Sequence, residues 1–408
     1  MTTLEQKSDQ LPQQLKDKKV LVTSESLGPI NGVTRATGYL LDYLLAQNVQ
    51  TAAVAPRLPK PAPSAWQMPL IRLGGFPLVY NPDLMIVTPF RMSKIFQHTF
   101  RPDVVYLASP ATLGLQAWWQ LRNSGIPMVA NFQTDLAFYA RLMLPSLPGK
   151  AAGWVIDRLT GYFFRHSSIK AVLCPSTSSQ NYLLRLGIAA EKLRLVGRGV
   201  DCLLFDPRKR NAELRQKLAP QGEVLLICVS RVSLEKGFEF LAEAYAEITR
   251  QARQKEPSLK FRLIITGGNA NAKIEQTVRG YFEKRGLDVV FTGPLVGEPL
   301  AEMFASADIF VYPSLTETFG QVIQEAMASG LPVVARREGG PADLVLPDKT
   351  GYLADPPDLV AFAKYALKLI EDATLRTSLG QTARMLAETR SWDAINQQIA
   401  TIMNDVVL

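Results

Sequence analysis

Short, continuous runs of apolar residues recur along the whole chain, and most are followed by a polar or glycine-containing loop and then by a segment with helical periodicity. A run of four to seven apolar residues without regular polar alternation is typical of a strand buried on both faces, as in a parallel sheet. Strands that alternate with helices predict an α/β protein with doubly wound parallel sheets. The expected strands are 19–23, 49–55, 104–107, 128–131, 171–174, 224–229, 261–266, 308–312 and 333–335.

The length and the residue types narrow the class of protein. A chain of 408 residues is long enough for two or three domains, each with its own core. The two histidines, His98 and His166, argue against a His-ligated metal site and against a Ser/His/Asp hydrolase. The three cysteines lie in or beside apolar runs without CxxC spacing, so we expect buried thiols.

Two glutamates stand eight residues apart in the segment that follows the strand 308–312. A loop over 313–318 and a helix from about Phe319 are expected there, because Gly330 and Pro332 end the helical pattern before the next apolar run. The first backbone N–H groups of a helix bind phosphate. The candidate phosphate-binding residues are therefore Thr318, Phe319 and Gly320.

The two glutamates themselves suit hydroxyl groups. Glu325, on the helix, would accept hydrogen bonds from ribose, and Glu317, in the loop, would accept them from an attached sugar. The alternative is that both glutamates only favour a helix start and a solvated face.

A second strand-to-helix loop, after 224–229, carries Arg231 and Lys236. Two fixed cations beside a helix N-terminus suit a diphosphate, although such a pair can also be surface charge. Gly268, after the strand 261–266, would let the backbone approach a ligand or simply make a turn. Near the N-terminus, Gly32 opens a helix capped by Asn31, and this helix start could face a donor phosphate. The loop 28–35 lacks the Gly-x-Gly-x-x-Gly spacing, so a nicotinamide dehydrogenase is disfavoured.

With these motifs together, the chain resembles the retaining glycosyltransferases of family 4, which adopt the two-domain GT-B fold. The resemblance rests on Arg231-x4-Lys236-Gly, on Glu317-x7-Glu325, on residues 197–201 and on the turn 339–343, where Asp343 replaces the usual Glu. It implies that Arg231 and Lys236 bind the donor diphosphate, that Glu317 lies near the sugar and the phosphates, and that Glu325 binds the ribose. Within the family, the chain looks most like sulfoquinovosyl-diacylglycerol synthases and phosphatidylinositol mannosyltransferases.

The resemblance also implies the domain organisation. We expect a polar tail over 1–18 and an acceptor-side Rossmann-like domain over 19–205. A nucleotide-sugar-binding Rossmann-like domain over 206–390 would face it across a cleft, and a helix over 391–408 would return to the first domain. Residues 206–210 are expected to form a polar hinge.

One departure from the family lies in residues 131–135, where relatives often carry Tyr-His-Thr-Asp or Tyr-His-Thr-His. Gln133 takes the place of the histidine, and an amide can bind a sugar hydroxyl but cannot transfer a proton near neutral pH. Gln133 and Asp135 are therefore candidates for the sugar or acceptor side. A buried amide that caps the end of a strand is the alternative for Gln133.

The charge is concentrated in the first half of the chain. Residues 1–200 hold 21 Lys and Arg against 10 Asp and Glu, and the remainder holds 24 against 27. A basic half could dock on an anionic membrane surface or attract an acidic acceptor, or it could only keep the surface solvated. Residues 136–145 and the Trp118-Trp119 pair add apolar bulk that could meet a membrane, although such clusters are more often core.

We therefore expect a retaining hexosyltransferase that moves a sugar from a UDP- or GDP-sugar to a hydroxyl of a lipid or a small molecule. The leaving diphosphate would help to deprotonate the acceptor while Arg231 and Lys236 stabilise its charge, without a metal or a cofactor. The alternative is a nucleotide-sugar-binding protein without transfer. We expect a cytoplasmic location, either free or peripheral on a membrane, because no apolar run approaches the roughly 20 residues of a membrane helix and residues 1–19 lack a hydrophobic signal segment. We expect no nucleic-acid partner.

Overall fold

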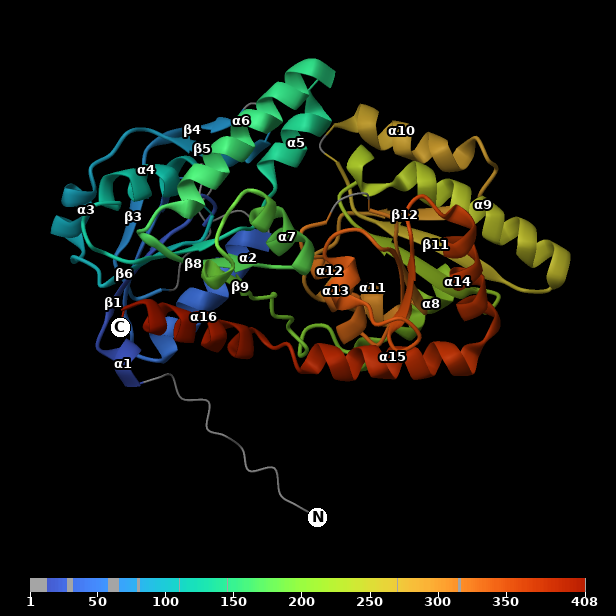
Figure 1. The fold of residues 1–408 in the computed structure, drawn as a ribbon. Coiled ribbons are helices and arrows are strands. Elements are labelled where there is room, and N and C mark those ends of the chain that lie inside the picture. The colour runs from blue at the N-terminus through green and yellow to red at the C-terminus, as the bar shows by residue number, and fades with distance from the viewer. Residues whose placement is uncertain are drawn as a thin grey trace, which may run out of the picture. The chain divides into compact units, whose positions relative to one another are not determined.

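The computed structural model describes residues 13–27, 32–57, 66–78, 81–109, 111–144, 146–269, 271–314 and 317–407. The chain divides into two compact units, each with its own core. Unit 1 runs to Gly199 and also includes the C-terminal residues from Trp392, and unit 2 comprises Val200–Ser391. Figure 1 shows the ribbon and labels many of the elements of both units.

Unit 1 is built on a seven-stranded sheet in which all neighbouring strands are parallel, in the order β3-β2-β1-β6-β7-β8-β9. Neighbouring residues of β1 enter opposite cores, because Leu21 packs on one face of the sheet and Val20 and Val22 on the other. The strands are β1 (Lys19–Thr23), β2 (Gln50–Pro56), β3 (Leu70–Leu73), β6 (Val104–Leu107), β7 (Met128–Asn131), β8 (Ile169–Cys174) and β9 (Leu193–Leu195). An antiparallel pair, β4 (Gly75–Leu78) and β5 (Asn81–Val87), stands apart from this sheet.

Helices cover both faces of this sheet. Buried residues of α4 and α6 belong to one core, and those of α2 and α16 belong to the other. The helices are α1 (Gln13–Lys16), α2 (Gly32–Ala46), α3 (Met92–His98), α4 (Thr112–Leu121), α5 (Leu136–Met143), α6 (Ser146–Arg165), α7 (Thr177–Arg185), the short η1 (Ala190–Lys192) and α16 (Trp392–Val407).

Unit 2 has a six-stranded parallel sheet in the order β12-β11-β10-β13-β14-β15. Its strands are β10 (Val224–Val229), β11 (Phe261–Thr266), β12 (Val289–Gly293), β13 (Ile309–Tyr312), β14 (Val333–Arg336) and β15 (Gly351–Ala354). Its helices are η2 (Pro207–Lys209), α8 (Ala212–Leu218), η3 (Leu234–Lys236), α9 (Phe238–Lys255), α10 (Ala272–Glu283), α11 (Glu298–Ser306), α12 (Gln321–Ala328), α13 (Pro341–Leu344), α14 (Leu359–Glu371) and α15 (Ala373–Glu388).

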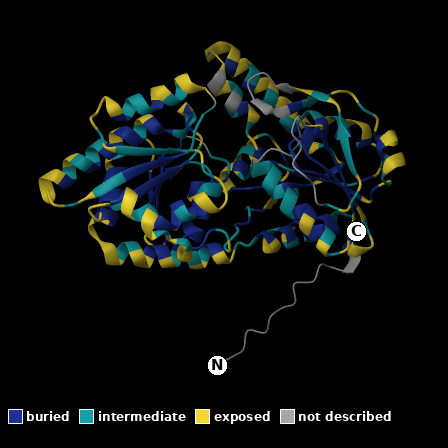
Figure 2. Ribbon diagram, turned by 180° about the vertical axis from the view of Figure 1, so that it is seen from behind, coloured by how far each residue is buried: buried dark blue, intermediate teal, exposed yellow. Residues whose placement is uncertain are grey.

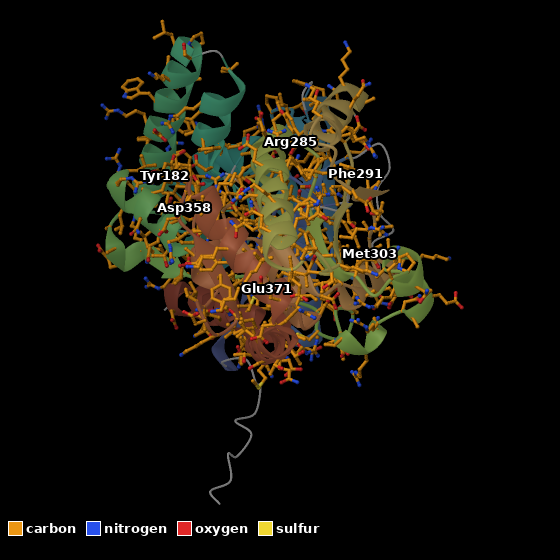
Figure 3. The ribbon with its side chains drawn as sticks, turned by 90° about the vertical axis from the view of Figure 1, so that its right-hand side faces the viewer. Tyr182, Arg285, Phe291, Met303, Asp358 and Glu371 are labelled. Atoms are coloured by element: carbon orange, nitrogen blue, oxygen red, sulfur yellow. The ribbon has the colours of Figure 1, made fainter. Side chains whose placement is uncertain are left out.

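The helices of unit 2 also form two layers. α9 and α14 bury their apolar residues on one face of the sheet, and α11 and α12 bury theirs on the other. α15 contributes Leu379 to the first core and Ala383 and Ala387 to the second. Figure 3 labels Asp358, whose carboxylate accepts a hydrogen bond from the Ala361 N–H and so caps α14, and Glu371, the last residue of that helix. Figure 2 shows that the strands are mostly buried while the outer faces of the helices are exposed. The fold class predicted from the sequence, α/β with two doubly wound Rossmann-like parts, is confirmed.

Two boundaries differ from those expected. Leu15, inside the predicted tail, lies on α1 and is fully buried in the core of unit 1, so the residues just before β1 are packed. The chain also enters unit 2 at Val200, before the predicted hinge. Asp206, the first residue of that hinge, is buried and accepts two hydrogen bonds from the Arg208 side chain, which hold the pKa of Asp206 at about 2.

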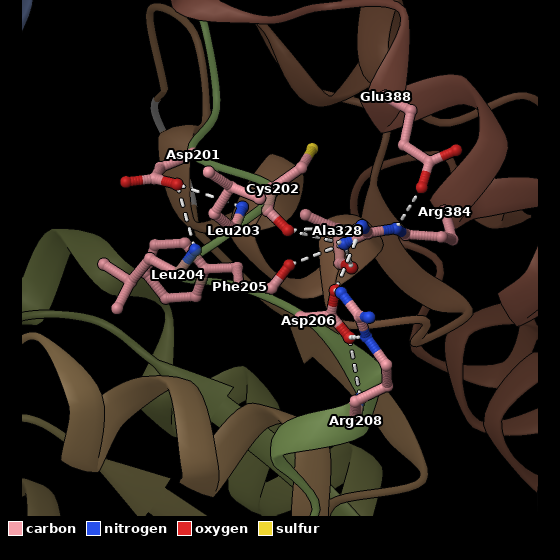
Figure 4. A network of polar contacts seen from close by, with 10 residues as sticks. All are labelled: Asp201, Cys202, Leu203, Leu204, Phe205, Asp206, Arg208, Ala328, Arg384 and Glu388. Atoms are coloured by element: carbon pink, nitrogen blue, oxygen red, sulfur yellow. Dashed lines mark hydrogen bonds and ion pairs between the residues drawn. The ribbon is translucent and has the colours of Figure 1, made fainter.

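The early entry into unit 2 is explained by Arg384 of α15 (Figure 4). Its guanidinium donates hydrogen bonds to the carbonyl oxygens of Cys202, Phe205 and Ala328, at 3.2, 2.7 and 2.6 Å. It also lies 3.4 Å from a carboxylate oxygen of Asp206. A single fixed cation therefore satisfies the backbone of a segment that has no regular structure, and it holds that segment against the core of unit 2.

We predict that Arg384→Ala destabilises unit 2 by about 2–4 kcal/mol, because it leaves buried carbonyl groups without a donor and Asp206 without one of its cations. Chemical unfolding monitored by circular dichroism measures the change. The matched control is Arg250→Ala on α9, whose partner Glu247 shares the solvent-exposed face of that helix. It should shift stability by less than about 0.5 kcal/mol. Equal shifts for the two variants would contradict the role given to Arg384.

Candidate functional site

The strand order of unit 2 identifies where a ligand can bind. The chain winds outward from β10 through β11 to β12, and then returns to β13 on the other side of β10. In open parallel sheets, ligands bind outside the carboxyl ends of the strands at such a reversal. The loops that leave β10 and β13 at this point carry Lys236 and Glu317.

Lys236 and Glu317 are in direct contact at the carboxyl edge of the sheet. The Lys236 ammonium donates to a carboxylate oxygen of Glu317 at 3.0 Å, and the Tyr312 hydroxyl donates to the same oxygen at 2.5 Å. Lys236 also lies 3.4 Å from the Tyr312 hydroxyl. The side chains of Lys236 and Glu317 are 11% and 18% exposed, so the pair is largely shielded and each group is held by its partner.

Tyr312, the last residue of β13, is a member of this cluster that the sequence analysis took only as part of a strand. Burial, and next the charge of Glu317, hold the pKa of its hydroxyl well above the ordinary value. The hydroxyl therefore stays protonated and donates a hydrogen bond to Glu317. A tyrosine that ends a buried strand a few residues before a loop glutamate is a signal that sequence reasoning could have used.

Close backbone contacts hold the loop that carries Glu317. The N–H of Gly340 donates to the Glu317 carbonyl oxygen at 2.8 Å. A Cβ at Gly340 would come within 2.0 Å of the Phe319 carbonyl oxygen, and one at Gly339 within 2.1 Å of that of Glu317. Only glycine permits this approach. The turn 339–343, which the sequence analysis singled out, thus fixes the backbone of Glu317.

The helix after this loop begins later than expected. α12 starts at Gln321, because Gly320 has φ +98° and ends the irregular segment in the left-handed conformation. Phe319 is buried, and Thr318 is half-buried. A Cβ placed at Gly320 would lie 3.5 Å from the Glu317 Cγ, so Glu317 lies beside the start of α12. The candidate phosphate-binding residues therefore precede the first turn of the helix.

The other candidate residues of unit 2 lie on α12 and on the loops after β10 and β11. Glu325 lies on α12 and is buried. The Gly268 carbonyl oxygen accepts from the Val232 N–H at 3.1 Å, which ties the loop after β11 to the loop after β10. Arg231 is not in contact with Glu317: its side chain is 68% exposed and lies 3.6 Å from Glu235. Its guanidinium is accessible to a ligand from solvent.

The candidates of unit 1 form a separate group. Gln133 is buried, donates to the Ala108 carbonyl oxygen at 2.8 Å and accepts from Arg198 at 2.8 Å. A Cβ at Gly32, the first residue of α2, would come within 2.6 Å of the Arg198 guanidinium. Asp135 caps α5 by accepting from the Phe138 N–H. Asn31, the expected cap of α2, lies outside the described residues.

A buried carboxyl group that the sequence analysis did not single out lies at the carboxyl end of β1. Glu25 accepts from the N–H groups of Ala111, Leu113 and Gly114 at 3.1, 2.6 and 2.9 Å, and so holds the start of α4. Burial raises the pKa of Glu25 to about 7, against the lowering effect of these hydrogen bonds. Its contacts explain it as an anchor for α4.

Comparisons with known proteins agree with this architecture. Residues 30–202 match the family described as Glycosyltransferase Family 4, and residues 209–386 match the glycosyl transferases group 1. A GDP-mannose-dependent alpha-mannosyltransferase of Mycolicibacterium smegmatis is 34% identical over 392 residues, which cover 93% of this chain and 96% of the relative. The sulfoquinovosyl transferase SQD2 of Arabidopsis thaliana is 32% identical over 80% of this chain and 61% of its own length.

Solved structures show the same fold. The Anabaena protein HepE in complex with UDP-glucose matches 95% of this chain and 100% of its own, with a TM-score of 0.71 and 21% identity. Sucrose-phosphate synthase from Thermosynechococcus elongatus matches 95% of this chain and 98% of its own, with a TM-score of 0.75 and 21% identity.

The chain is therefore a glycosyltransferase with the GT-B fold, and it belongs to family 4. It is a hexosyltransferase, and its donor is a nucleotide sugar. This supports the transferase over the alternative of a binding protein without transfer.

We predict that Gly340→Ala lowers both stability and nucleotide affinity, because the new methyl group forces the loop 317–320 away from the turn. The loss of stability should be about 1–3 kcal/mol. Thermal unfolding and calorimetric titration with UDP and GDP measure the two effects. Gly280→Ala on α10 is the matched control, since a Cβ there has nothing within 4 Å, and in a helix alanine is favoured over glycine by about 1 kcal/mol. A Gly340→Ala protein that behaves like the control would contradict the support assigned to this turn.

Proposed function

We propose that this protein is a retaining hexosyltransferase that transfers a sugar from a nucleoside-diphosphate sugar to a hydroxyl of a membrane lipid. The observation that supports it best is the cluster of Lys236, Glu317 and Tyr312 at the strand reversal of unit 2. It combines a shielded cation, which suits a diphosphate, with a carboxylate that accepts hydrogen bonds from sugar hydroxyls.

The donor diphosphate is bound in this proposal by Lys236, by Arg231 and by the backbone of Thr318, Phe319 and Gly320. An ammonium group has three N–H donors. Among the described residues, Lys236 uses them toward Glu317 and the Tyr312 hydroxyl, so a further direction can serve a phosphate oxygen without breaking the ion pair. The exposed Arg231 can swing onto the second phosphate, where a planar guanidinium binds two oxygens at once.

Glu325 and Gly268 complete the nucleotide site. Glu325 accepts the ribose hydroxyls from its position on α12, and Gly268 lets the loop after β11 pass close to the nucleotide. The role of Glu325 depends on a fixed acceptor, and the role of Gly268 depends on the absence of a side chain. Neither residue has to gain or lose a proton.

The transfer step follows from the charges. As the bond between the anomeric carbon and the diphosphate breaks, negative charge grows on the leaving oxygen, and Lys236 and Arg231 stabilise it. The same oxygen takes the proton of the acceptor hydroxyl, which attacks from the same face, so that the configuration of the sugar is retained. Glu317 holds the sugar and, through its contact with Lys236, fixes the ammonium. No metal is needed in this scheme.

Unit 1 carries the acceptor in this proposal. Gln133 is held by Ala108 and Arg198, so it can offer only a fixed amide to the sugar. Asp135 acts through α5, which it caps. Three relatives are matched over at least 90% of their own length, and all three are GDP-mannose-dependent alpha-mannosyltransferases. GDP-mannose is therefore the first donor to test against UDP-sugars. SQD2, a sulfoquinovosyl transferase, makes a nucleotide-linked sulfoquinovose the next.

The direct test incubates the purified protein with each donor and with extracted lipids, and detects glycolipid by thin-layer chromatography and mass spectrometry. A product whose anomeric configuration equals that of the donor supports the proposal. Release of free sugar alone, with every lipid and small acceptor offered, would remove the lipid acceptor from it.

Replacing Lys236 should abolish most of the activity. For Lys236→Ala we expect turnover to fall by about 10²–10³, because one preorganised donor to the developing charge is lost. Initial rates at saturating donor give the effect, and circular dichroism shows that the variant is folded. The control is Lys255→Ala on α9, which removes a surface pair with Glu371 and should leave the rate unchanged. A normal rate for Lys236→Ala would exclude the assigned role.

Metal removal should have little effect. The described residues contain no group of three or more His, Cys, Asp or Glu side chains that could hold a metal ion, and the two cations of unit 2 are proposed to supply the charge that a metal would otherwise supply. We expect the rate in excess EDTA to stay within about twofold of the rate in Mg²⁺, since only positioning and fixed charge are required. A loss of activity that Mg²⁺ or Mn²⁺ restores would show that a metal takes part.

A further inference from the structure

The solvent-facing side of α6 carries many apolar residues, which departs from the pattern of a helix on the surface of a globular protein. Residues at helical spacing on this side are exposed: Leu147, Ala151, Trp154, Arg158, Leu159 and Tyr162. The opposite side of the helix is buried through Gly149, Gly153 and Phe163. Leu147 is 76% exposed, and Trp154 and Leu159 are each 58% exposed.

The neighbouring helix α4 continues this apolar surface. The Trp118 ring is buried between the two helices and meets the rings of Tyr162 and Trp119 edge-on, at 5.8 and 6.0 Å. Trp119 itself is 53% exposed. Of the 18 large apolar side chains that are exposed among the described residues, nine lie between residues 115 and 162. We call the exposed residues of α4 and α6 the α4–α6 ridge, and isolated exposed side chains would not cluster in this way.

Cations accompany the ridge, and exposed carboxylates are lacking on α6. Lys150, Arg158 and Arg165 are exposed on this helix. Its one acidic residue, Asp157, is half-buried and is held by Arg141 and by the Tyr182 hydroxyl. The guanidinium groups of Arg158 and Arg122 lie over the rings of Trp154 and Trp119, at 5.3 and 3.4 Å from the ring centres. Each exposed tryptophan of the ridge is thus paired with a positive charge at the edge of the apolar surface.

We propose that the α4–α6 ridge is a membrane-binding surface, with the apolar side chains in the interface of a bilayer and the cations on anionic lipid headgroups. A helix with an apolar face that carries Trp and Leu, bordered by Lys and Arg, is suited to lie in that interface. Charge favours a bilayer over a second copy of the chain, because two such ridges would bring Lys150 and Arg158 against their own counterparts. No helix among the described residues is both long and apolar enough to cross a membrane.

This inference rests on the lipid acceptor of the proposed function, and it adds the surface by which the protein would bind the membrane that contains that lipid. Vesicle binding is measured without donor or acceptor, so its outcome is separate from that of the transfer assay. The ridge also corrects the sequence analysis in part. Trp119 is exposed while Trp118 is buried, and among the side chains that the structure describes more of the exposed apolar ones belong to α6 than to residues 136–145.

The test is co-sedimentation of the full chain with two kinds of vesicle. One is pure phosphatidylcholine, and the other contains roughly 30 mol% phosphatidylglycerol, which makes its surface anionic. We expect binding to the anionic vesicles that weakens with salt. Trp154→Ser with Leu159→Ser should weaken it by about tenfold or more, and Lys150→Gln with Arg158→Gln by about fivefold for each charge. Val360→Ser with Met385→Ser, which removes apolar side chains that are 60% and 59% exposed in unit 2, is the matched control and should bind as the wild type does.

Tryptophan fluorescence of the unaltered protein gives a second measurement that does not depend on the folding of a variant, because brominated lipids should quench it on binding. Trp154→Phe and Trp119→Phe should then reduce that quenching. The inference is overturned if the wild type does not bind anionic vesicles at low salt, or if the Trp154 and Leu159 variant binds as well as the control. It is also overturned if sedimentation velocity shows a dimer that this variant dissociates, since the ridge would then bind a second copy.

Discussion

The candidate site of unit 2 depends on one constraint, the close approach of backbone from separate loops at the carboxyl edge of its sheet. Gly339 and Gly340 bring their turn against the carbonyl oxygens of Glu317 and Phe319. At the other end of the same loop, a Cβ at Gly237 would come within 2.1 Å of the Pro313 carbonyl oxygen. The loop that carries Glu317 is therefore held at both ends by close backbone contacts, which glycine residues make possible. Such a loop can place a carboxylate accurately.

The ion pair inside this frame serves two requirements at once. Without a ligand, Lys236 and Glu317 neutralise each other, so neither charge is left unpaired in a largely shielded position. If a diphosphate binds as proposed, the same ammonium gains a second anionic partner, and Tyr312 continues to donate to the carboxylate. In that proposal the site is preorganised, since binding adds a partner without first separating the two charges.

Much of this could be predicted from the sequence, because apolar runs buried on both faces of a sheet leave a clear pattern. The bounds of β1, β6, β7, β10 and β11 agree with those predicted, and the expected C-terminal helix is α16, which packs on unit 1. The short edge strands β9, β12 and β15 were missed, because they are only partly apolar or contain glycine. The start of α12 was placed too early, since the conformation of Gly320 depends on its packing against Ile323 and Leu344.

The candidate site was predictable in its charged residues and much less so in its contacts. Lys236 and Glu317 were both named, but their ion pair and the part of Tyr312 depend on which strands become neighbours. Gln133 was seen as a departure, whereas its bond to Arg198 joins residues far apart in the sequence. The apolar ridge of α6 was not predicted, because helical periodicity alone does not show which side of a helix faces the core.

The position of α16 gives unit 1 a particular order of assembly. Residues Ile399, Ala400 and Met403 of this helix are packed in the same core as Leu15 and Leu40, yet all of unit 2 lies between them in the sequence. During synthesis, unit 2 is complete in the nascent chain before the last layer of unit 1 has been translated. The core of unit 1 is therefore completed only after unit 2 has been made, and its apolar surface stays exposed until α16 has been translated.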